Sequence, residues 1–302
     1  MLIDSLAAYV RSRQLEKSSR QRIQSSVRRW VRFGGSPDRD GWTPDYMQSV
    51  QDAMAARFAL ETAYRTTKDV IGIIKQAGHP VKPLRLLRVP QPIPDVPTLD
   101  EFSRIWRACC VARLPAVDPC GQWRRFLAVL YFTGLRCSDA RSLTWEQVGG
   151  EAITIRAAKT GKIQTIPIHP VLRKVLASGG VGHIFSIGPR QFYAEFIRIR
   201  RHARLNITAQ HIRRLAAQQF EQAHGGAGAL ILGHSLPRET AYYLWPPMIL
   251  REACARLAVP DCLVDPGTIR EKSVSLAALR RVALRLSVAK IGELTRIAGA
   301  IG

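Results

Sequence analysis

A proline-rich segment constrains the fold of this chain more than any other feature. Residues 78–97 (GHPVKPLRLLRVPQPIPDVP) contain six prolines. Proline lacks a backbone N–H and its ring clashes with a continuing helix, so the segment suits neither a helix interior nor a central strand. We therefore expect an extended, fairly stiff linker that divides the chain into two domains, 1–77 and 98 onward. A length of 302 residues is ample for two ordinary domains.

The segment before the linker carries apolar residues at helical spacing, which predicts a small bundle of amphipathic helices. Gly34 and Gly35 are expected to end one of these helices. The three apolar stripes are Ile23, Val27, Trp30 and Val31; Met47, Val50, Met54 and Phe58; and Val70, Ile71, Ile73, Ile74 and Ala77.

The segment after the linker predicts helices with one small sheet. Thr98 and Glu101 are spaced as a capping box, so a helix should begin near residue 99. Residues 152–168 alternate apolar and polar side chains on both sides of Thr160-Gly161, which indicates a β-hairpin. Helical patterns return near residue 192 and from 210. The expected fold class is mainly α with a small β-sheet, and a helical tail at 251–302 follows the domain 98–250.

The charge of the chain points to a polyanionic partner, most often nucleic acid. Lys and Arg number 45 against 23 Asp and Glu, for a formal net charge of +22. Residues 11–32 and 190–214 are strongly basic and contain one acid each, Glu16 and Glu195. Solvated faces usually mix signs, although simple solvation is the alternative. The candidate DNA-contacting residues are Arg11, Arg13, Lys17, Arg20, Arg22, Arg28, Arg29, Lys162, Arg198, Arg200, Arg201 and Arg204.

The cysteines and the apolar runs suggest a location. None of the six cysteines has zinc-site spacing, so we expect no metal site and reduced thiols that behave as small apolar groups. No apolar run reaches the roughly 18 residues of a membrane helix, and the first residues lack a signal-peptide pattern. We expect a cytoplasmic, nucleoid-associated protein with no membrane partner.

Four segments of the second domain carry residues that could act on a phosphate. In TGLRCSD (133–139), Asp139 lies one helical turn after Arg136 and can hold its guanidinium, whose planar fork suits phosphate oxygens. The predicted hairpin presents Lys159. In HIRR (211–214), His211 and Arg214 are three residues apart and share a helix face. The fourth segment is LGHS (232–235) with the tyrosines that follow it, and each segment alone is a weak signal.

In the order R…K…HxxR…GH…Y, these segments resemble the tyrosine recombinase (phage integrase) family. The resemblance covers roughly 1–247 and implies a helical, SAM-like core-binding domain at 1–77, then a linker and a catalytic domain. It implies cleavage and rejoining of double-stranded DNA through a 3′-phosphotyrosine without metal or cofactor, and a homotetramer when two sites are paired.

The resemblance also implies roles for individual residues. Tyr243 lies nine residues beyond His234, at the family's offset for the nucleophile, which favours it over Tyr242. Asp139 stands where the family more often has Glu. In the implied site Arg136 and Arg214 clamp the phosphate, His211 is the candidate base, His234 is a further donor and Lys159 protonates the leaving oxygen.

Several features depart from the family pattern. Leu215 follows Arg214 where His or Lys is common, and the glycines at 225, 226 and 228 are expected to make that stretch flexible. Residues 248–302 match nothing in the family, and the tail could pack on a neighbouring subunit or on its own domain. Two other readings stay open: a DNA-binding relative that no longer cuts DNA, and a type IB topoisomerase. The occupation of all six catalytic positions argues against the first.

Overall fold

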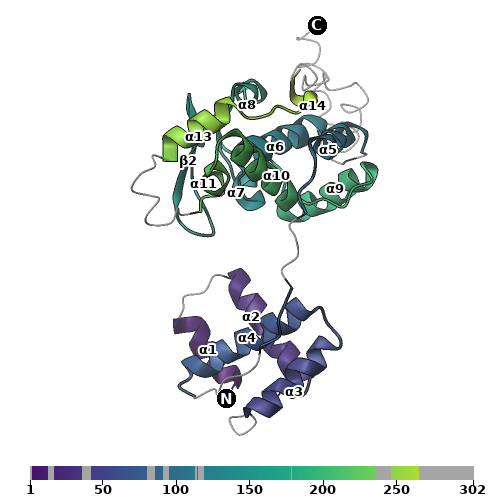
Figure 1. The fold of residues 1–302 in the computed structure, drawn as a ribbon, viewed down its shortest axis with the longest axis vertical. Helices are drawn as coiled ribbons and strands as arrows, with labels where there is room; N and C mark the ends of the chain where they lie inside the picture. Colours follow the sequence, from purple (N-terminus) through teal and green to yellow (C-terminus); the bar gives the residue numbers. More distant parts are fainter. Residues whose placement is uncertain are drawn as a thin grey trace, which may run out of the picture. The chain divides into compact units, whose positions relative to one another are not determined.

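The computed structural model describes residues 2–12, 17–35, 42–79, 86–90, 95–112, 114, 119–177, 179–234 and 246–264. The chain divides into two compact units, Met1–Ile93 and Pro94–Gly302 (Figure 1). The predicted fold class is confirmed, since the described elements are helices apart from one two-stranded antiparallel sheet.

The first unit is a bundle of α1 (Leu2–Ser12), α2 (Lys17–Arg32), α3 (Pro44–Ala55) and α4 (Leu60–Gln76). Its core consists largely of the predicted stripes, with Trp30, Met47 and Ile73 fully buried, although Val31 and Phe58 are exposed. Helix α2 ends just before Gly34, whose φ of 88° is left-handed, as the glycine pair predicted.

The second unit begins with the predicted capping box. The hydroxyl of Thr98 accepts the N–H of Glu101 at 3.1 Å, and the Glu101 carboxylate accepts the N–H of Thr98 at 2.8 Å. Its helices up to the sheet are α5 (Leu99–Val111), α6 (Pro119–Thr133), α7 (Cys137–Arg141) and the 3₁₀ turn η2 (Trp145–Gln147). The middle of α6 is buried on every side, which explains its continuous apolar sequence.

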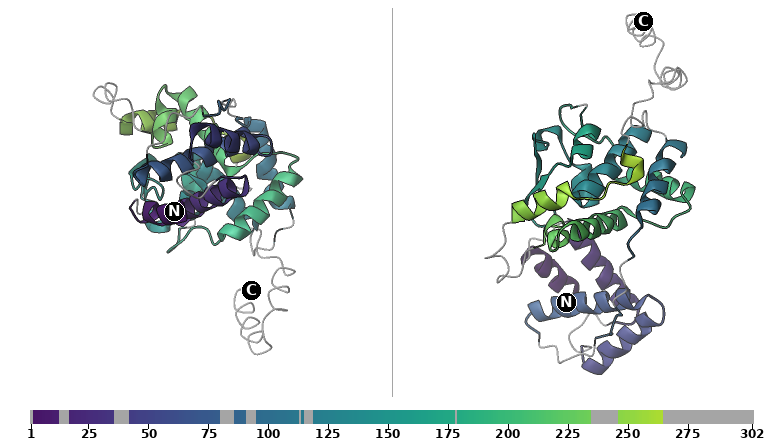
Figure 2. Two further views of the ribbon diagram at one scale, coloured as in Figure 1. Left: turned by 90° about the horizontal axis from the view of Figure 1, so that it is seen from below. Right: turned by 45° about the horizontal axis from the view of Figure 1, so that its top comes forward.

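The predicted hairpin is confirmed as β1 (Ala152–Arg156) and β2 (Ile163–Pro167), which pair antiparallel with Ala152 opposite Pro167. Gly161 in the turn has a φ of 69°. Among the described residues, the helices after the sheet are α8 (Pro170–Val175), α9 (Pro189–His202), α10 (Ala209–Ala223), α11 (Ala227–Ile231), α13 (Pro246–Ala255) and α14 (Asp261–Val264). Helix α10 packs against α6, α11 and α13 and is the frame of the site described below (Figure 2).

The described part of the C-terminal region packs on its own unit. Helix α13 continues past residue 250, after which the tail was expected to begin, and Ile249, Leu250, Ala253 and Cys254 are buried in the core that α10 and α11 share. Helix α14 contacts α5. Residues 265–302, the rest of the expected helical tail, lie outside the described residues.

The expectation that all six cysteines are reduced is corrected. Cys110 and Cys120 form a disulfide with their Cα atoms 4.6 Å apart, because the end of α5 and the start of α6 bring the two side chains together. The other four are free thiols. Within the described ranges no cluster of His, Cys, Asp and Glu side chains could hold a metal ion. None of the described helices is long and apolar enough to cross a membrane.

Candidate active site

The loop that presents Arg136 follows directly from the end of α6. Gly134 has a φ of 56°, and a Cβ there would lie 3.2 Å from the side chain of Ile231. Glycine therefore suits the left-handed backbone, and its missing Cβ leaves room for the side chain of Ile231 in α11. After this turn Arg136 is the N-cap residue of α7, and its side chain is one-quarter exposed.

Asp139 connects the Arg136 segment to the β-hairpin. Its carboxylate is buried, and Oδ2 lies 3.8 Å from Nη1 of Arg136, so the predicted ion pair is present. The other oxygen, Oδ1, accepts the backbone N–H of Ala158 at 3.2 Å. One carboxylate thus fixes Arg136 relative to the residue that precedes Lys159.

The hairpin turn holds Lys159 and Lys162 at its exposed tip. The turn is closed by backbone hydrogen bonds from the N–H of Ala157 to Lys162 O at 2.9 Å and from the N–H of Gly161 to Ala157 O at 2.8 Å. The guanidinium of Arg156 also donates to Gly161 O at 3.1 Å. The backbone of the tip is therefore well defined, while the Lys159 side chain extends into solvent.

The two arginines of α10 point in different directions. Arg213 is 4% exposed, and it donates through Nη1 to the carbonyl of Gly134 and through Nη2 to the carbonyl of Leu232, the latter at 2.8 Å. Burial, with a smaller contribution from the charge of Arg136, lowers the pKa of Arg213 to about 10, and Asp139 opposes that shift. Arg213 is therefore still a cation at neutral pH.

Arg214, the arginine assigned from the sequence, is half-buried and donates to the carbonyl of Asp95 at 3.4 Å. His211 is also half-buried, and its Nδ1 has no hydrogen-bond partner among the described residues. No hydrogen bond or ion pair joins either side chain to Arg136 in the described part of the chain. The structure thus brings Arg213, rather than Arg214, against the Arg136 loop, because residues of a helix are about 100° apart.

The sequence contained a signal for Arg213 that the motif spacing obscured. The buried face of α10 includes Ala209, Ile212, Ala216 and Phe220. Arg213 follows Ala209 by four residues and precedes Ala216 by three, so it falls within this apolar face. A charged residue at a core position of a helix needs polar partners, and here those partners are two backbone carbonyls.

Helix α11 places His234 at its C-terminal end. Gly233 has a φ of 70°, its N–H binds Leu230 O at 2.8 Å, and the N–H of His234 binds Ala229 O at 3.1 Å. These two bonds form a Schellman motif, which fixes the backbone of His234 relative to α11. The His234 side chain is exposed. Tyr243 and Tyr242 lie outside the described residues.

The basic residues of the first unit are not equivalent. Arg22 forms an ion pair with Asp69 of α4, and Arg29 donates to the Thr66 hydroxyl at 2.7 Å while its guanidinium lies over the Phe58 ring. These two arginines therefore stabilise the bundle itself. Arg22 is nevertheless exposed, as are the candidates Arg11, Lys17, Arg20 and Arg28, and Arg13 lies outside the described residues.

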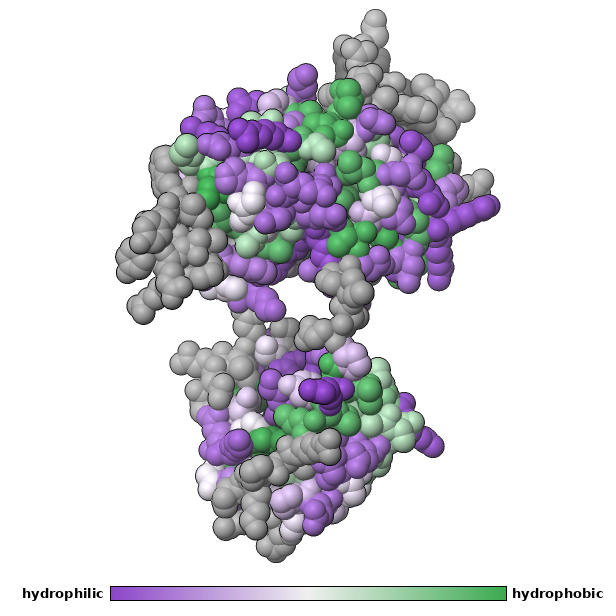
Figure 3. Space-filling view, viewed as in Figure 1, coloured by the Kyte–Doolittle hydropathy of each residue, from purple (hydrophilic) through white to green (hydrophobic). Residues whose placement is uncertain are grey.

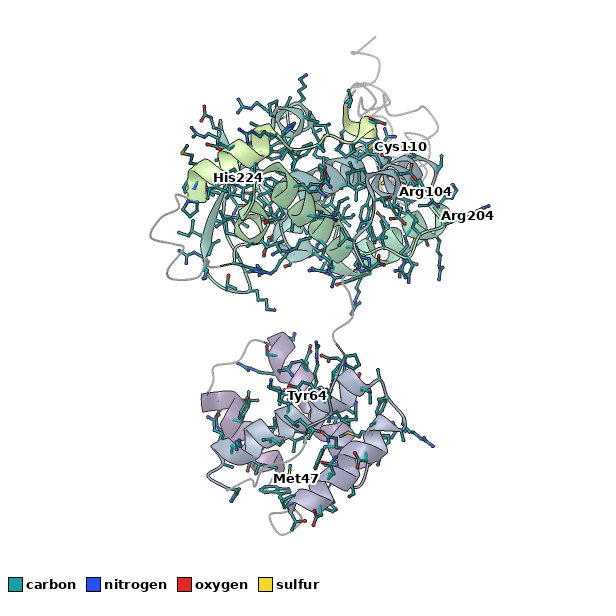
Figure 4. All side chains as sticks on the ribbon, in the orientation of Figure 1. Met47, Tyr64, Arg104, Cys110, Arg204 and His224 are labelled. Atoms are coloured by element: carbon teal, nitrogen blue, oxygen red, sulfur yellow. A yellow bond between two sulfur atoms is a disulfide. The ribbon has the colours of Figure 1, made fainter. Side chains whose placement is uncertain are left out.

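Helix α9 and the two residues that follow it carry the second basic group. Arg198, Arg201 and Arg204 are exposed, and Arg204 is at the edge of the second unit (Figure 4). Glu195, the one acid expected among them, is instead buried and accepts the indole N–H of Trp123 at 2.7 Å, so it does not offset the exposed charge. Arg200 is half-buried and donates to Asn206. Figure 3 shows hydrophilic side chains over much of the visible face of this unit, between apolar patches.

Comparison with solved structures identifies the fold. A lambda integrase dimer bound to a COC′ core site matches with a TM-score of 0.62 at 18% identity, over 77% of this chain and 94% of that chain. A lambda integrase tetramer bound to a Holliday junction matches with a TM-score of 0.64 at 18% identity, over 79% and 77%. XerH site-specific recombinase, in a post-cleavage complex with a palindromic difH substrate, gives 0.59 at 13% identity, over 77% of each chain.

No protein-family model and no curated protein matches the sequence. The structural matches are nevertheless long and mutually consistent. The chain therefore has the tyrosine recombinase, or phage integrase, fold that its motifs predicted.

Proposed function

We propose that this protein is a site-specific DNA recombinase that cleaves and rejoins double-stranded DNA through a 3′-phosphotyrosine at Tyr243. One observation supports this most strongly: hydrogen bonds tie together motif segments that are far apart in the sequence. Arg213 binds the carbonyls of Gly134 and Leu232, and Asp139 binds the N–H of Ala158. Gly134 lies two residues before Arg136, Leu232 lies two residues before His234, and Ala158 directly precedes Lys159.

The residue types suit a reaction at a phosphodiester. The transition state has more negative charge on the phosphate oxygens than the ground state, so cationic hydrogen-bond donors held in place accelerate the reaction. We assign Arg136 as one clamp on these oxygens. For the second clamp we keep Arg214, which is half-buried, because Arg213 is 4% exposed and uses its two Nη groups on backbone carbonyls, so Arg213 supports the Arg136 loop from within the fold.

The proposed cleavage step is an in-line displacement. The phenolic oxygen of Tyr243 forms a bond to phosphorus while the bond from phosphorus to the 5′-oxygen breaks. His211 takes the phenolic proton, Lys159 gives a proton to the 5′-oxygen, and His234 donates to a non-bridging oxygen. Attack by a 5′-hydroxyl on the phosphotyrosine reverses the step. Because the covalent intermediate conserves the phosphodiester energy, this reaction needs neither metal nor nucleotide cofactor.

The two-unit organisation supports separate roles for the two units on DNA. We assign residues 1–77 to core binding, 78–97 to the linker and 98–250 to catalysis. The exposed basic residues of α1, α2 and α9 would contact phosphates, which supplies affinity rather than sequence choice. Because a solved lambda integrase of this fold is a tetramer on a Holliday junction, we extend the proposal to a homotetramer on paired sites, acting on the nucleoid in the cytoplasm.

A two-site assay tests this function against its alternatives. Supercoiled plasmids carrying the DNA that flanks the gene, with one or two copies of the site, are incubated with the protein without divalent metal. Exchange that requires two sites supports the recombinase. Relaxation of single-site plasmids without exchange would instead indicate a type IB topoisomerase. Tight, salt-sensitive binding with no cleavage would indicate a DNA-binding protein that no longer cuts.

A further inference from the structure

The glycine-rich stretch before His234 is anchored rather than loose. Oε1 of Glu221 accepts the N–H of Gly226 at 2.9 Å, and Oε2 of the same carboxylate accepts the N–H of Gly228 at 2.9 Å. Glu221 is in the last turn of α10, and the two glycines begin α11. One carboxylate thus satisfies two of the N–H groups that the start of a helix leaves without partners.

Backbone conformation and close packing explain why glycine stands at positions 226 and 228, which corrects the expectation that this stretch is flexible. Gly226 has a φ of 83°, a left-handed conformation that side chains rarely adopt. At Gly228 a Cβ would lie 2.6 Å from the carbonyl oxygen of Ala217. The glycine at this position therefore lets α11 pack directly on the backbone of α10.

The other end of α11 is held by the same helix. Arg213 donates to the carbonyl of Leu232, which is the C-cap residue of α11. Helix α11 is therefore attached to α10 at both ends, through a carboxylate at its start and a guanidinium at its end. Its five residues are too few to form a stable helix without such contacts.

We propose that Glu221 is a positioning residue for His234, acting through α11. The proposal rests on the function proposed above. The carboxylate fixes the start of α11, and the Schellman motif transmits that position to the backbone of His234. The side chain of Ile231, in the same helix, lies 3.2 Å from where a Cβ on Gly134 would be. Without Glu221, α11 moves relative to α10, and His234 spends less time where it can reach the phosphate.

Single-turnover cleavage at saturating DNA tests the role. Glu221→Ala removes both acceptors, and Glu221→Gln retains one oxygen but turns an NH₂ group toward the other N–H. We expect the cleavage rate to fall about 10- to 100-fold in Glu221→Ala and less in Glu221→Gln, with the Kd for DNA nearly unchanged. Gln218→Ala, an exposed change on the same helix, is the matched control and should leave both quantities unchanged.

A double-mutant cycle separates positioning from general stabilisation. If Glu221 acts through His234, then Glu221→Ala should have little further effect on the cleavage rate of a His234→Ala variant. Independent effects that multiply would overturn the proposal.

Amide hydrogen exchange tests the attachment of α11 to α10 by Glu221 without relying on activity. In the full-length protein, Glu221→Ala should speed exchange of the N–H groups of Gly226–His234 and leave the middle of α10 protected. Unchanged exchange in this segment would overturn the proposal whatever the cleavage result. Faster exchange in a protein that never forms a DNA adduct would support the attachment of α11 by Glu221 and refute only the recombinase function.

Discussion

Arg213 donates a hydrogen bond to the carbonyl oxygen of Gly134, two residues before Arg136. This bond joins α10 to the loop that follows α6, and the second bond of Arg213, to Leu232, joins both to the segment that carries His234. The guanidinium is buried and cationic at the point where three motif segments meet. A neutral residue of the same size could not satisfy both carbonyls and also contribute positive charge beside Arg136.

The two arginines of α10 should therefore differ under substitution. Arg213→Lys retains the charge but cannot bridge two carbonyls, so the Arg136 loop loses its support and we expect single-turnover cleavage to fall about 10- to 100-fold. Arg213→Ala should also destabilise the second unit, because two carbonyls lose their partner, at about 1–3 kcal/mol each. Arg214→Ala should lower single-turnover cleavage about 100-fold or more with little change in stability, because it removes a donor to the phosphate oxygens. A nearly active Arg214→Ala would remove Arg214 from the phosphate clamp.

Local features of the fold were predictable from the sequence, because each depends on neighbouring residues. The capping box of Thr98 and Glu101, the end of α2 at Gly34 and the hairpin turn at Gly161 all formed as expected. The anchored glycines before α11 were misread as flexible. A glycine can mark a flexible backbone or a site where two backbones pack closely. Only the tertiary structure, here the approach of Gly228 to the carbonyl of Ala217, distinguishes the two cases.

The sequence predicted which segments form the candidate site, but not how their side chains contact one another. The motifs correctly paired Arg136 with Asp139, because three residues span one helical turn. They did not reveal that Asp139 also binds Ala158, nor that Arg213 faces inward, because those partners are 19 or more residues away. The Cys110–Cys120 bond is only 10 residues long in sequence, but it depends on how α5 packs against α6, which local patterns do not reveal.

Arg28 and Arg22 of α2 should differ in DNA binding, because Arg22 is held in an ion pair with Asp69. Arg28 is exposed, so Arg28→Ala should weaken binding and reduce the slope of log K against log salt by about one. Arg22 is paired with Asp69, so Arg22→Ala should leave that slope nearly unchanged and lower the thermal midpoint of the first unit. A salt titration of both variants checks this. Equal slopes for Arg28→Ala and the unmodified protein would remove Arg28 from the DNA interface.

His169 should make the stability of the second unit depend on pH. Its Nδ1 accepts the N–H of Val171 at 3.1 Å and its ring stacks on Phe132, so the fold favours the neutral imidazole. Burial lowers the pKa of His169 below its ordinary value of 6.5. The unfolded chain therefore binds a proton first as pH falls, and the contribution of this residue is present above pH 6.5 and is lost below it.

Denaturant unfolding at pH 7.5 and 5.5 measures this loss, which is at most about 1.4 kcal/mol per pH unit for one group. His169→Asn keeps an N-cap acceptor that does not titrate in this range. The variant should show a smaller fall in the free energy of unfolding between the two pH values than the unmodified protein. An equal fall in the free energy of unfolding of both proteins would show that His169 does not cause the pH dependence.

The disulfide between Cys110 and Cys120 should stabilise the second unit. It closes a short loop of sequence separation 10, for which the chain-entropy account gives about 3 kcal/mol. Reductant or Cys110→Ser should lower the free energy of unfolding by about this amount, and Cys137→Ser is a control at a free thiol. Thiol titration of the unfolded, unreduced protein should count four groups. A count of six would show that the bond does not form in solution.

The most direct test of the account is to trap the covalent intermediate. The protein is incubated, without divalent metal, with nicked duplexes tiled across the DNA that flanks its gene, and products are separated on a denaturing gel. We predict a protein–DNA adduct that survives Tyr242→Phe and disappears in Tyr243→Phe, while the latter variant still binds DNA. An adduct that survives Tyr243→Phe, or no adduct on a duplex that the protein binds specifically, would contradict the proposed reaction.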